Sequence, residues 1–209
     1  MTVQDENVTI IEAGERFLVE DRDSGSKGIM PILVDAGYKI EVIKVDKGIL
    51  QNERDRERAC DYMLVANGDT DDENSTSGGL NRVICMTELK GTGKENEINH
   101  AYSQVSQSID RIPAEYMKST DYMMAAIAGA QDKTLPSMIN PEKKKLCEKM
   151  YSKSRHKVND MNKLVFYIQP NVRIRKAFVN TSKNPRVIEC YSRKGAEIPV
   201  PSMLVDVIK

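Results

Sequence analysis

Three charged residues beside two apolar segments have types and spacing that could do chemistry together. Asp61 is the one acid in the otherwise apolar run 60–66, and Glu88 and Lys90 close the apolar run 82–90. Burying an unpaired carboxylate is costly, so such an acid normally has a partner, and a divalent cation is a good one. Asp61 and Glu88 on adjacent strands could hold one Mg²⁺, which prefers oxygen ligands and keeps waters that a phosphate can join or displace.

The spacing of Glu88 and Lys90 predicts a role for the lysine. Side chains two residues apart in a strand lie on the same face, so the ammonium of Lys90 can stand beside an attacking water. There it could orient or help deprotonate that water and offset charge growing on the phosphate. The alternative is a strand-end ion pair in which Asp61 and Glu88 simply neutralise Lys90 or an arginine.

A helix must follow these strands to complete the arrangement. Apolar residues of segment 95–112 recur at spacings of three and four, which predicts an amphipathic helix. Gln104 and Gln107 lie three apart at the edge of its apolar stripe, where a side chain could turn back toward the strand ends. The alternative is that both are ordinary surface glutamines.

The remaining elements complete an α/β fold. We expect a mixed central β-sheet flanked by helices, with core strands at about 40–46, 59–66 and 82–90, and further strands at 164–170, 173–180 and 186–191. Segment 8–20 fits a helix or a strand. Helices are expected at 116–130 and, strongly basic, at 142–157. The regions 67–79 and 135–141 have loop and linker composition.

The length favours one domain. The 209 residues, 40% of them hydrophobic, are enough for a single domain with its own core. We expect a motif core at about 40–112 and a basic C-terminal part at about 141–209. The four cysteines contain no C-x-x-C pair and the two histidines lie far apart, which excludes a zinc finger, a haem site and a disulfide scaffold. The apolar stretch 123–130 is too short to span a membrane, so we expect a cytoplasmic protein.

The charges are unevenly distributed although they sum to zero. Residues 1–80 carry 18 acidic and nine basic side chains, whereas residues 141–194 carry 15 basic and four acidic ones. A local basic field of this kind attracts phosphates, although a solvated helix surface would have the same composition. The candidate nucleic-acid-binding residues are Lys143, Lys144, Lys145, Lys149, Lys153, Arg155, Lys157, Arg173, Arg175 and Lys176.

The order of these motifs resembles that of a known family. Val45-Asp46-Lys47-Gly48, Arg58 to Tyr62 with Asp61, Glu88-Leu89-Lys90-Gly91 and Ala101-x-x-Gln104 together resemble the PD-(D/E)xK nuclease superfamily, whose fold is called restriction-endonuclease-like, and in particular its small bacterial members. The similarity covers residues 40–112. The acidic segment 69–73 departs from the pattern, because it would repel nucleic acid if it folded over the site.

The resemblance implies a metal-dependent nuclease that hydrolyses phosphodiester bonds, with DNA favoured over RNA, and a place in defence against foreign DNA. It implies that Asp61 and Glu88 bind Mg²⁺ (Mn²⁺ could substitute), that Lys90 assists the water and that Gln104 supports the site. The family also often has a glutamate on its first helix, and Glu12, Glu15 and Glu20 are the candidates for this residue. Cutting both strands would need a second active site, which favours a homodimer.

Other functions fit the same residues. A nuclease-like domain without activity could act as a nucleic-acid-binding or protein adaptor, which needs the basic residues but not the carboxylates. The acidic and basic halves could instead be complementary surfaces of a self-associating structural protein. Cys60, Cys85 and Cys147 could act as nucleophiles, but no histidine is near them in sequence, and buried structural cysteines are expected.

Overall fold

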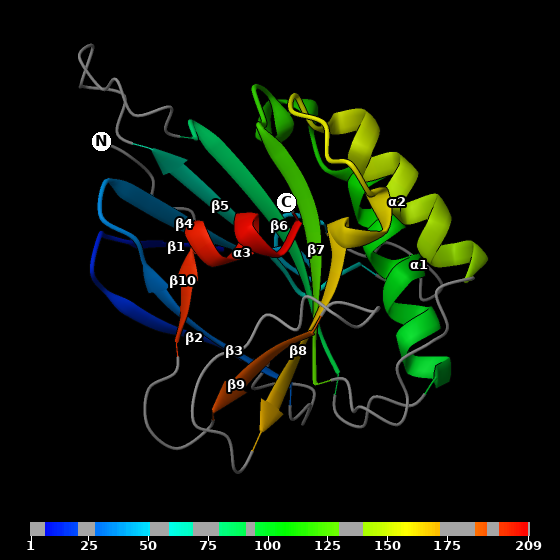
Figure 1. The fold of residues 1–209 in the computed structure, drawn as a ribbon, viewed down its shortest axis with the longest axis horizontal. Coiled ribbons are helices and arrows are strands. Elements are labelled where there is room, and N and C mark those ends of the chain that lie inside the picture. The colour runs from blue at the N-terminus through cyan, green and yellow to red at the C-terminus, as the bar shows by residue number, and fades with distance from the viewer. Residues whose placement is uncertain are drawn as a thin grey trace.

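The protein has an α/β architecture built on a mixed β-sheet, as the sequence predicts (Figure 1). The computed structural model describes residues 7–20, 28–50, 59–68, 80–90, 95–129, 140–171, 187–191 and 197–208. Strands form a large and a small sheet, and helices pack on the large one. A hydrophobic core joins residues from both sheets and from the helices.

The large sheet has seven strands in the order β1-β4-β5-β6-β7-β8-β9. The strands β1, β4, β5 and β6 pair in antiparallel fashion, and β6, β7, β8 and β9 pair in parallel. The sheet is therefore mixed, with β6 at the junction of its two halves. Its strands are β1 (Val8–Ile11), β4 (Tyr38–Lys44), β5 (Tyr62–Gly68), β6 (Arg82–Leu89), β7 (Tyr122–Ala128), β8 (Val165–Asn171) and β9 (Val187–Tyr191).

The small sheet has three strands in the order β10-β3-β2. These are β2 (Arg16–Glu20), β3 (Ile29–Val34) and β10 (Ile198–Val200), the last followed by helix α3 (Ser202–Ile208). Segment 8–20, which fitted a helix or a strand, is thus two strands. Neither β3 nor the elements after residue 197 were among the predicted ones.

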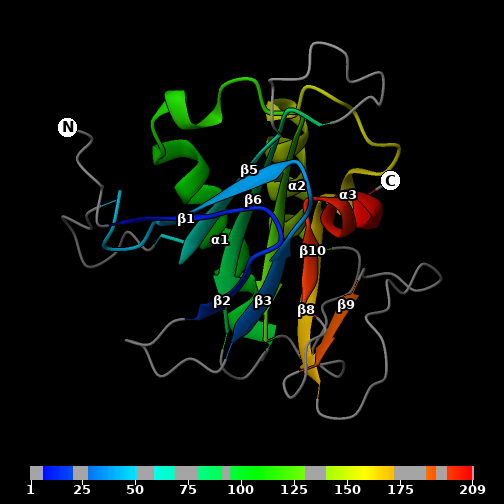
Figure 2. The ribbon, with the colours of Figure 1, turned by 90° about the vertical axis from the view of Figure 1, so that its left-hand side faces the viewer.

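Two long helices lie side by side on one face of the large sheet, and the small sheet lies on the other face (Figures 1 and 2). Helix α1 (Glu95–Arg111) contacts β6 and β7, and α2 (Pro141–Lys153) contacts α1 and β7. The side chain of Asn140 accepts hydrogen bonds from the amides of Glu142 and Lys143, which caps α2, and proline suits the first helical position. None of the described helices is both long and apolar enough to cross a lipid bilayer.

The helix predicted for residues 116–130 is wrong. A 3-10 helix, η1 (Ala114–Met117), is followed by the strand β7, in which every residue is buried. β7 lies between β6 and β8 with a layer on each face, so all of its side chains are apolar or small and no alternation appears. A short run of this kind cannot be distinguished from a buried helix by periodicity.

The other predicted elements that fall within the described residues agree with the structure apart from their ends. The basic helix ends at Lys153 and not at 157, because Ser154 is already extended and its amide and hydroxyl both donate to the carbonyl of Met150. A second 3-10 helix, η3 (Met161–Leu164), leads into β8. The strand predicted at 173–180 and most of the loop and linker regions predicted at 67–79 and 135–141 lie outside the described residues.

Candidate active site

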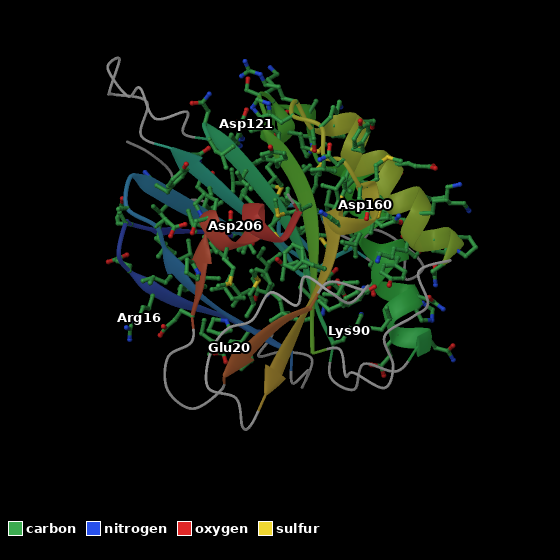
Figure 3. All side chains as sticks on the ribbon, viewed as in Figure 1. Arg16, Glu20, Lys90, Asp121, Asp160 and Asp206 are labelled. Atoms are coloured by element: carbon green, nitrogen blue, oxygen red, sulfur yellow. The ribbon has the colours of Figure 1, made fainter. Side chains whose placement is uncertain are left out.

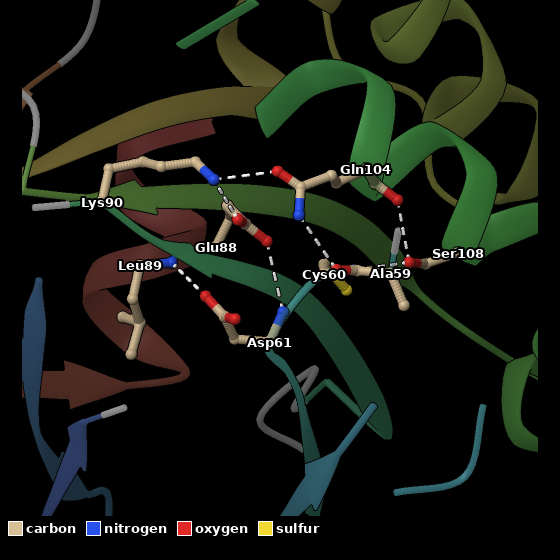
Figure 4. A network of polar contacts seen from close by, with 8 residues as sticks. All are labelled: Ala59, Cys60, Asp61, Glu88, Leu89, Lys90, Gln104 and Ser108. Carbon is tan, nitrogen blue, oxygen red and sulfur yellow. Dashed lines mark hydrogen bonds and ion pairs between the residues drawn. The ribbon is translucent and has the colours of Figure 1, made fainter. Parts of the chain in front are cut away.

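The antiparallel pairing of β5 and β6 brings Asp61 to Glu88. Tyr62 pairs with Thr87, so the residue before β5 meets the end of β6. The amide of Asp61 donates to Oε2 of Glu88 at 3.2 Å, and Oδ2 of Asp61 accepts from the amide of Leu89 at 2.7 Å (Figure 4). Asp61 therefore stands at the entrance to the strand, partly buried, where the sequence placed it inside the strand.

Lys90 and Glu88 lie on the same face, as their spacing predicts. The ammonium of Lys90 donates to Oε1 of Glu88 at 2.5 Å, and the side chains are 16% and 2% exposed. At the same time the ammonium donates to Oε1 of Gln104 at 2.8 Å. These two acceptors hold the Lys90 ammonium between the end of β6 and helix α1.

Helix α1 ties the lysine to the start of β5. Nε2 of Gln104 donates to the carbonyl of Ala59 at 3.2 Å, so its amide bridges Lys90 and the residues before Asp61. One turn later, Ser108 accepts from the amide of Cys60 at 2.8 Å and donates to the carbonyl of Gln104 at 2.8 Å. The structure thus brings together Asp61, Glu88, Lys90 and Gln104 in one network (Figure 4).

Ser108 was not among the predicted site residues. It is fully buried on the face of α1 that meets the sheet, four residues after Gln104. A small polar residue at that spacing in the apolar stripe was the signal in the sequence, because a buried hydroxyl needs partners. The other glutamine, Gln107, donates to Ser103 of its own helix and takes no part in the network.

Burial and two neighbouring charged residues determine the pKa of Glu88. The pKa of Glu88 is raised to about 8, first by burial and second by the charge of Asp61, and Lys90 opposes both effects. When both are ionised, Asp61 and Glu88 therefore carry more negative charge than the partly buried ammonium of Lys90 offsets. A proton or a bound cation would offset the rest.

The donor atoms fit a hard divalent cation. Two carboxylates with waters are a usual protein contribution to a Mg²⁺ site, and oxygen donors suit Mg²⁺ and Mn²⁺. Within the described residues, no group of three or more His, Cys, Asp and Glu side chains is placed to hold a metal ion. Any cation here would therefore depend on Asp61 and Glu88.

The three N-terminal glutamates lie at different places. Glu15 accepts from the amide of Glu12 in the turn between β1 and β2, and both are exposed. The carbonyl of Glu20 accepts from the hydroxyl of Tyr62, the residue after Asp61. Glu20 and Lys90 lie toward the same end of the molecule in Figure 3. Of the three, Glu20 is the one that the structure brings next to the candidate site.

One of the predicted nucleic-acid-binding residues is not at the surface. Lys143 is 1% exposed, with its ammonium 5.6 Å from the centre of the Tyr167 ring, and burial lowers its pKa. Its place in the third position of a capped helix turns it toward β8, so its ammonium is not exposed to a phosphate backbone in this structure. The expectation for Lys143 is corrected.

The other predicted basic residues differ in their surroundings. Lys144, Lys145, Lys153, Arg155 and Lys157 are exposed. Lys144 pairs with Glu148 and Lys145 with Glu142, whereas Lys149 contacts Asp110 at 2.6 Å. Arg173, Arg175 and Lys176 lie outside the described residues.

The basic residues after α2 lie far from the candidate site. Arg155 and His156 approach the buried carboxylate of Asp121, at the start of β7. Because β6 and β7 are parallel, this point is at the end of the sheet opposite to Lys90 (Figure 3). The first turn of α2 is closer, since its cap Asn140 donates to Asn99 of α1. A cavity of about 620 Å³ between α2 and residues 158–162 is lined by none of the candidate catalytic residues.

The cysteines do not have the features of nucleophiles. Cys60, Cys85 and Cys147 are buried. Burial raises the pKa of Cys60, and raises that of Cys85 to about 12 and that of Cys147 to about 11. Reactive thiols have lowered pKa values, so these three are structural.

The sequence and fold were compared with known proteins. No protein-family model, curated protein or solved structure matches the chain. The geometry of the site and the resemblance of its motifs are therefore the two indications of what the protein does.

Proposed function

We propose that the protein is a metal-dependent nuclease that hydrolyses phosphodiester bonds, with DNA as the preferred substrate, and that its sheet and α1 form a restriction-endonuclease-like core. One observation carries the proposal. Asp61, Glu88, Lys90 and Gln104, chosen from the order of short motifs, meet in a single hydrogen-bonded network at one end of the sheet. An ordinary ion pair would need neither the second carboxylate nor the glutamine.

Each residue has a role in this proposal. Asp61 and Glu88 would hold Mg²⁺ or Mn²⁺, which when bound supplies a Lewis acid and lowers the pKa of water. The ammonium of Lys90 donates to two oxygens, which leaves its third N–H for the attacking water or the phosphate. Gln104 accepts from the charged ammonium and fixes its direction, because its own amide is anchored on Ala59.

The exposed lysines of α2 would supply attraction to phosphates. Lys144 and Lys145 lie in the first turns of α2, beside the half of α1 that precedes Gln104. Attraction of this kind does not depend on base sequence and falls steeply with salt. Cutting both strands of a duplex would require two copies of the site, and a homodimer would provide them.

The test is cleavage of plasmid DNA and of RNA by the purified protein with Mg²⁺, with Mn²⁺ and with EDTA. Cleavage that EDTA abolishes, and that Asp61→Ala, Glu88→Ala and Lys90→Ala each remove, is the expected result. Asp61→Ala should keep salt-sensitive DNA binding in a gel shift. A wild type that binds DNA in a salt-sensitive way but never cleaves would contradict the proposal and favour the adaptor function.

A further inference from the structure

Two glycines that are distant in sequence lie in close contact with the backbone of Lys90. A Cβ atom added to Gly28 would lie 2.7 Å from the amide nitrogen of Lys90, and one added to Gly129 would lie 1.8 Å from its carbonyl oxygen. Cβ atoms in proteins essentially never come within 3.0 Å of backbone atoms. Any other residue at either position must therefore displace Lys90 or the glycine's own segment.

The segments that carry these glycines are anchored. Gly129 follows β7, and its amide donates to the carbonyl of Ile168 in β8 at 2.8 Å. The amide of Lys90 donates to the carbonyl of Ala128 at 2.7 Å. Gly28 immediately precedes β3, and a Cβ on Gly129 would also approach the Cα of Gly28 to 3.3 Å. The ends of β3, β6 and β7 thus meet at one tightly packed point.

Lys90 is the residue that this packing fixes at the candidate site. Its side chain donates to Glu88 at 2.5 Å and to Gln104 at 2.8 Å, so a backbone shift of about 1 Å away from them would take both contacts beyond normal hydrogen-bonding distance. Since Gly129 is held to β8 on its other side, added volume there pushes toward the Lys90 carbonyl. The position of the ammonium therefore depends on two residues that never touch it.

We propose that Gly28 and Gly129 are positioning residues that set the Lys90 backbone and, through it, the ammonium beside Glu88. This inference rests on the proposed nuclease function. Neither glycine would contact the substrate. Their contribution is the close approach of three chain segments, which no side chain permits.

A backbone effect must be separated from this contact. Gly129 has φ +95°, a conformation that a side chain rarely adopts, so Gly129→Ala strains the backbone as well as Lys90. Gly37, in the turn between β3 and β4, has φ +76° with nothing within 4 Å of an added Cβ. Gly37→Ala thus reproduces the strain without the contact, whereas Gly28, with no positive φ, tests the contact alone.

The experiment measures kcat and KM for Mg²⁺-dependent plasmid cleavage by Gly28→Ala, Gly129→Ala and Gly37→Ala, below the melting temperature of each. A displacement of about 1 Å can cost about 100-fold in rate. We expect a fall of that order in kcat for Gly28→Ala and Gly129→Ala with little change in KM. Gly37→Ala should keep the wild-type kcat. Gly28 and Gly129 variants that match Gly37→Ala would overturn the proposal.

A double mutant separates positioning from a general loss of order. If Gly28 acts through Lys90, then Gly28→Ala should lower the residual rate of Gln104→Ala by much less than it lowers the wild-type rate, because both changes displace the same ammonium. An equal fall in both backgrounds would show that Gly28 maintains the fold only. A wild type without cleavage would instead refute the nuclease itself, and the positioning role with it.

Discussion

The backbone amide of Asp61 donates a hydrogen bond to the carboxylate of Glu88 at 3.2 Å. This bond joins the residue that precedes β5 to the end of β6, and a second bond from the Leu89 amide to Asp61 fixes the other carboxylate. Two acids are thereby held side by side, with the partly buried ammonium of Lys90 nearby. When both acids are ionised, this pair carries an excess of negative charge, which a proton or a cation can neutralise.

Replacing Glu88 by glutamine should stabilise the metal-free protein at high pH. The pKa of Glu88 is raised to about 8 in the folded state, from 4.5, by burial first and Asp61 second. An acid with a raised folded pKa gives its full stabilisation below the unfolded value and loses it as the pH rises through the folded value. The stability of wild type relative to Glu88→Gln should therefore fall from about pH 5 to about pH 8.

Urea denaturation in EDTA across that range checks this prediction. The matched control is Glu115→Gln, because Glu115 is exposed in η1 and far from the carboxylate pair in sequence. Its stability should follow that of wild type at every pH. Parallel curves of unfolding free energy against pH for wild type and Glu88→Gln would show that the surroundings of Glu88 do not raise its pKa in the folded state.

A divalent cation should restore the stability that the folded protein loses when Glu88 ionises. At 100 times its Kd, a ligand that binds only the folded protein stabilises it by about 2.7 kcal/mol. We expect Mg²⁺ or Mn²⁺ to raise the melting temperature of wild type at pH values near the pKa of Glu88. The shift should disappear in Asp61→Asn and in Glu88→Gln. A shift of equal size in all three proteins would place the cation elsewhere.

The two glutamines of α1 should differ in their effect on catalysis. Gln104 accepts from Lys90, whereas Gln107 contacts only Ser103 among the contacts described for its side chain. Residues that orient a ligating or catalytic group typically contribute about 10-fold to 100-fold to activity. Gln104→Ala should lower kcat by about that factor, and Gln107→Ala should leave it unchanged. Equal kcat values in the two variants would remove Gln104 from the site.

Ser108 should contribute to stability through the start of β5. Ser108→Ala leaves the buried amide of Cys60 without its acceptor, and an unsatisfied buried donor costs about 1–3 kcal/mol. Denaturant unfolding of Ser108→Ala should show a loss of about that size. The control is Ser152→Ala, since Ser152 is an exposed serine that donates to the carbonyl of Lys149 within α2. A loss no larger than that of the control would mean that the Cys60 amide finds another acceptor.

Lys143 should not take part in binding nucleic acid. It is buried beside Tyr167, so Lys143→Met removes a buried charge and leaves the surface as it was. We expect Lys143→Met to keep the DNA affinity, and the combined Lys144→Ala, Lys145→Ala and Lys153→Ala variant to weaken it. Each lost phosphate contact should reduce the slope of log affinity against log salt by about 0.9. Fluorescence anisotropy over a salt series measures both quantities.

The same salt series gives the outcome that would refute this assignment. A Lys143→Met variant with a reduced salt slope would mean that the lysine reaches the surface when DNA binds. A triple variant with an unchanged slope would mean that α2 does not contact the phosphates.

The sequence alone was sufficient for the strands that carry the site and for the helix above them. The elements β4, β5, β6 and α1 have strong periodicity or short β-rich runs, and their positions agree with the expected ranges to within a few residues. The set Asp61, Glu88, Lys90 and Gln104 also came from sequence order. Local patterns define these features because each is a property of a few consecutive residues.

Only the tertiary structure decided what depends on neighbours distant in the chain. β7 is a strand because it is enclosed by β6, β8 and the layers on both faces, which its seven buried residues cannot reveal by periodicity. Lys143 is buried because α2 turns that position toward β8. The approach of Gly28 and Gly129 to Lys90, and the hydrogen bond from Cys60 to Ser108, join segments that no short-range pattern connects. Sequence order therefore determined which residues could form the site, and long-range packing determined their distances, their burial and the backbone that holds them.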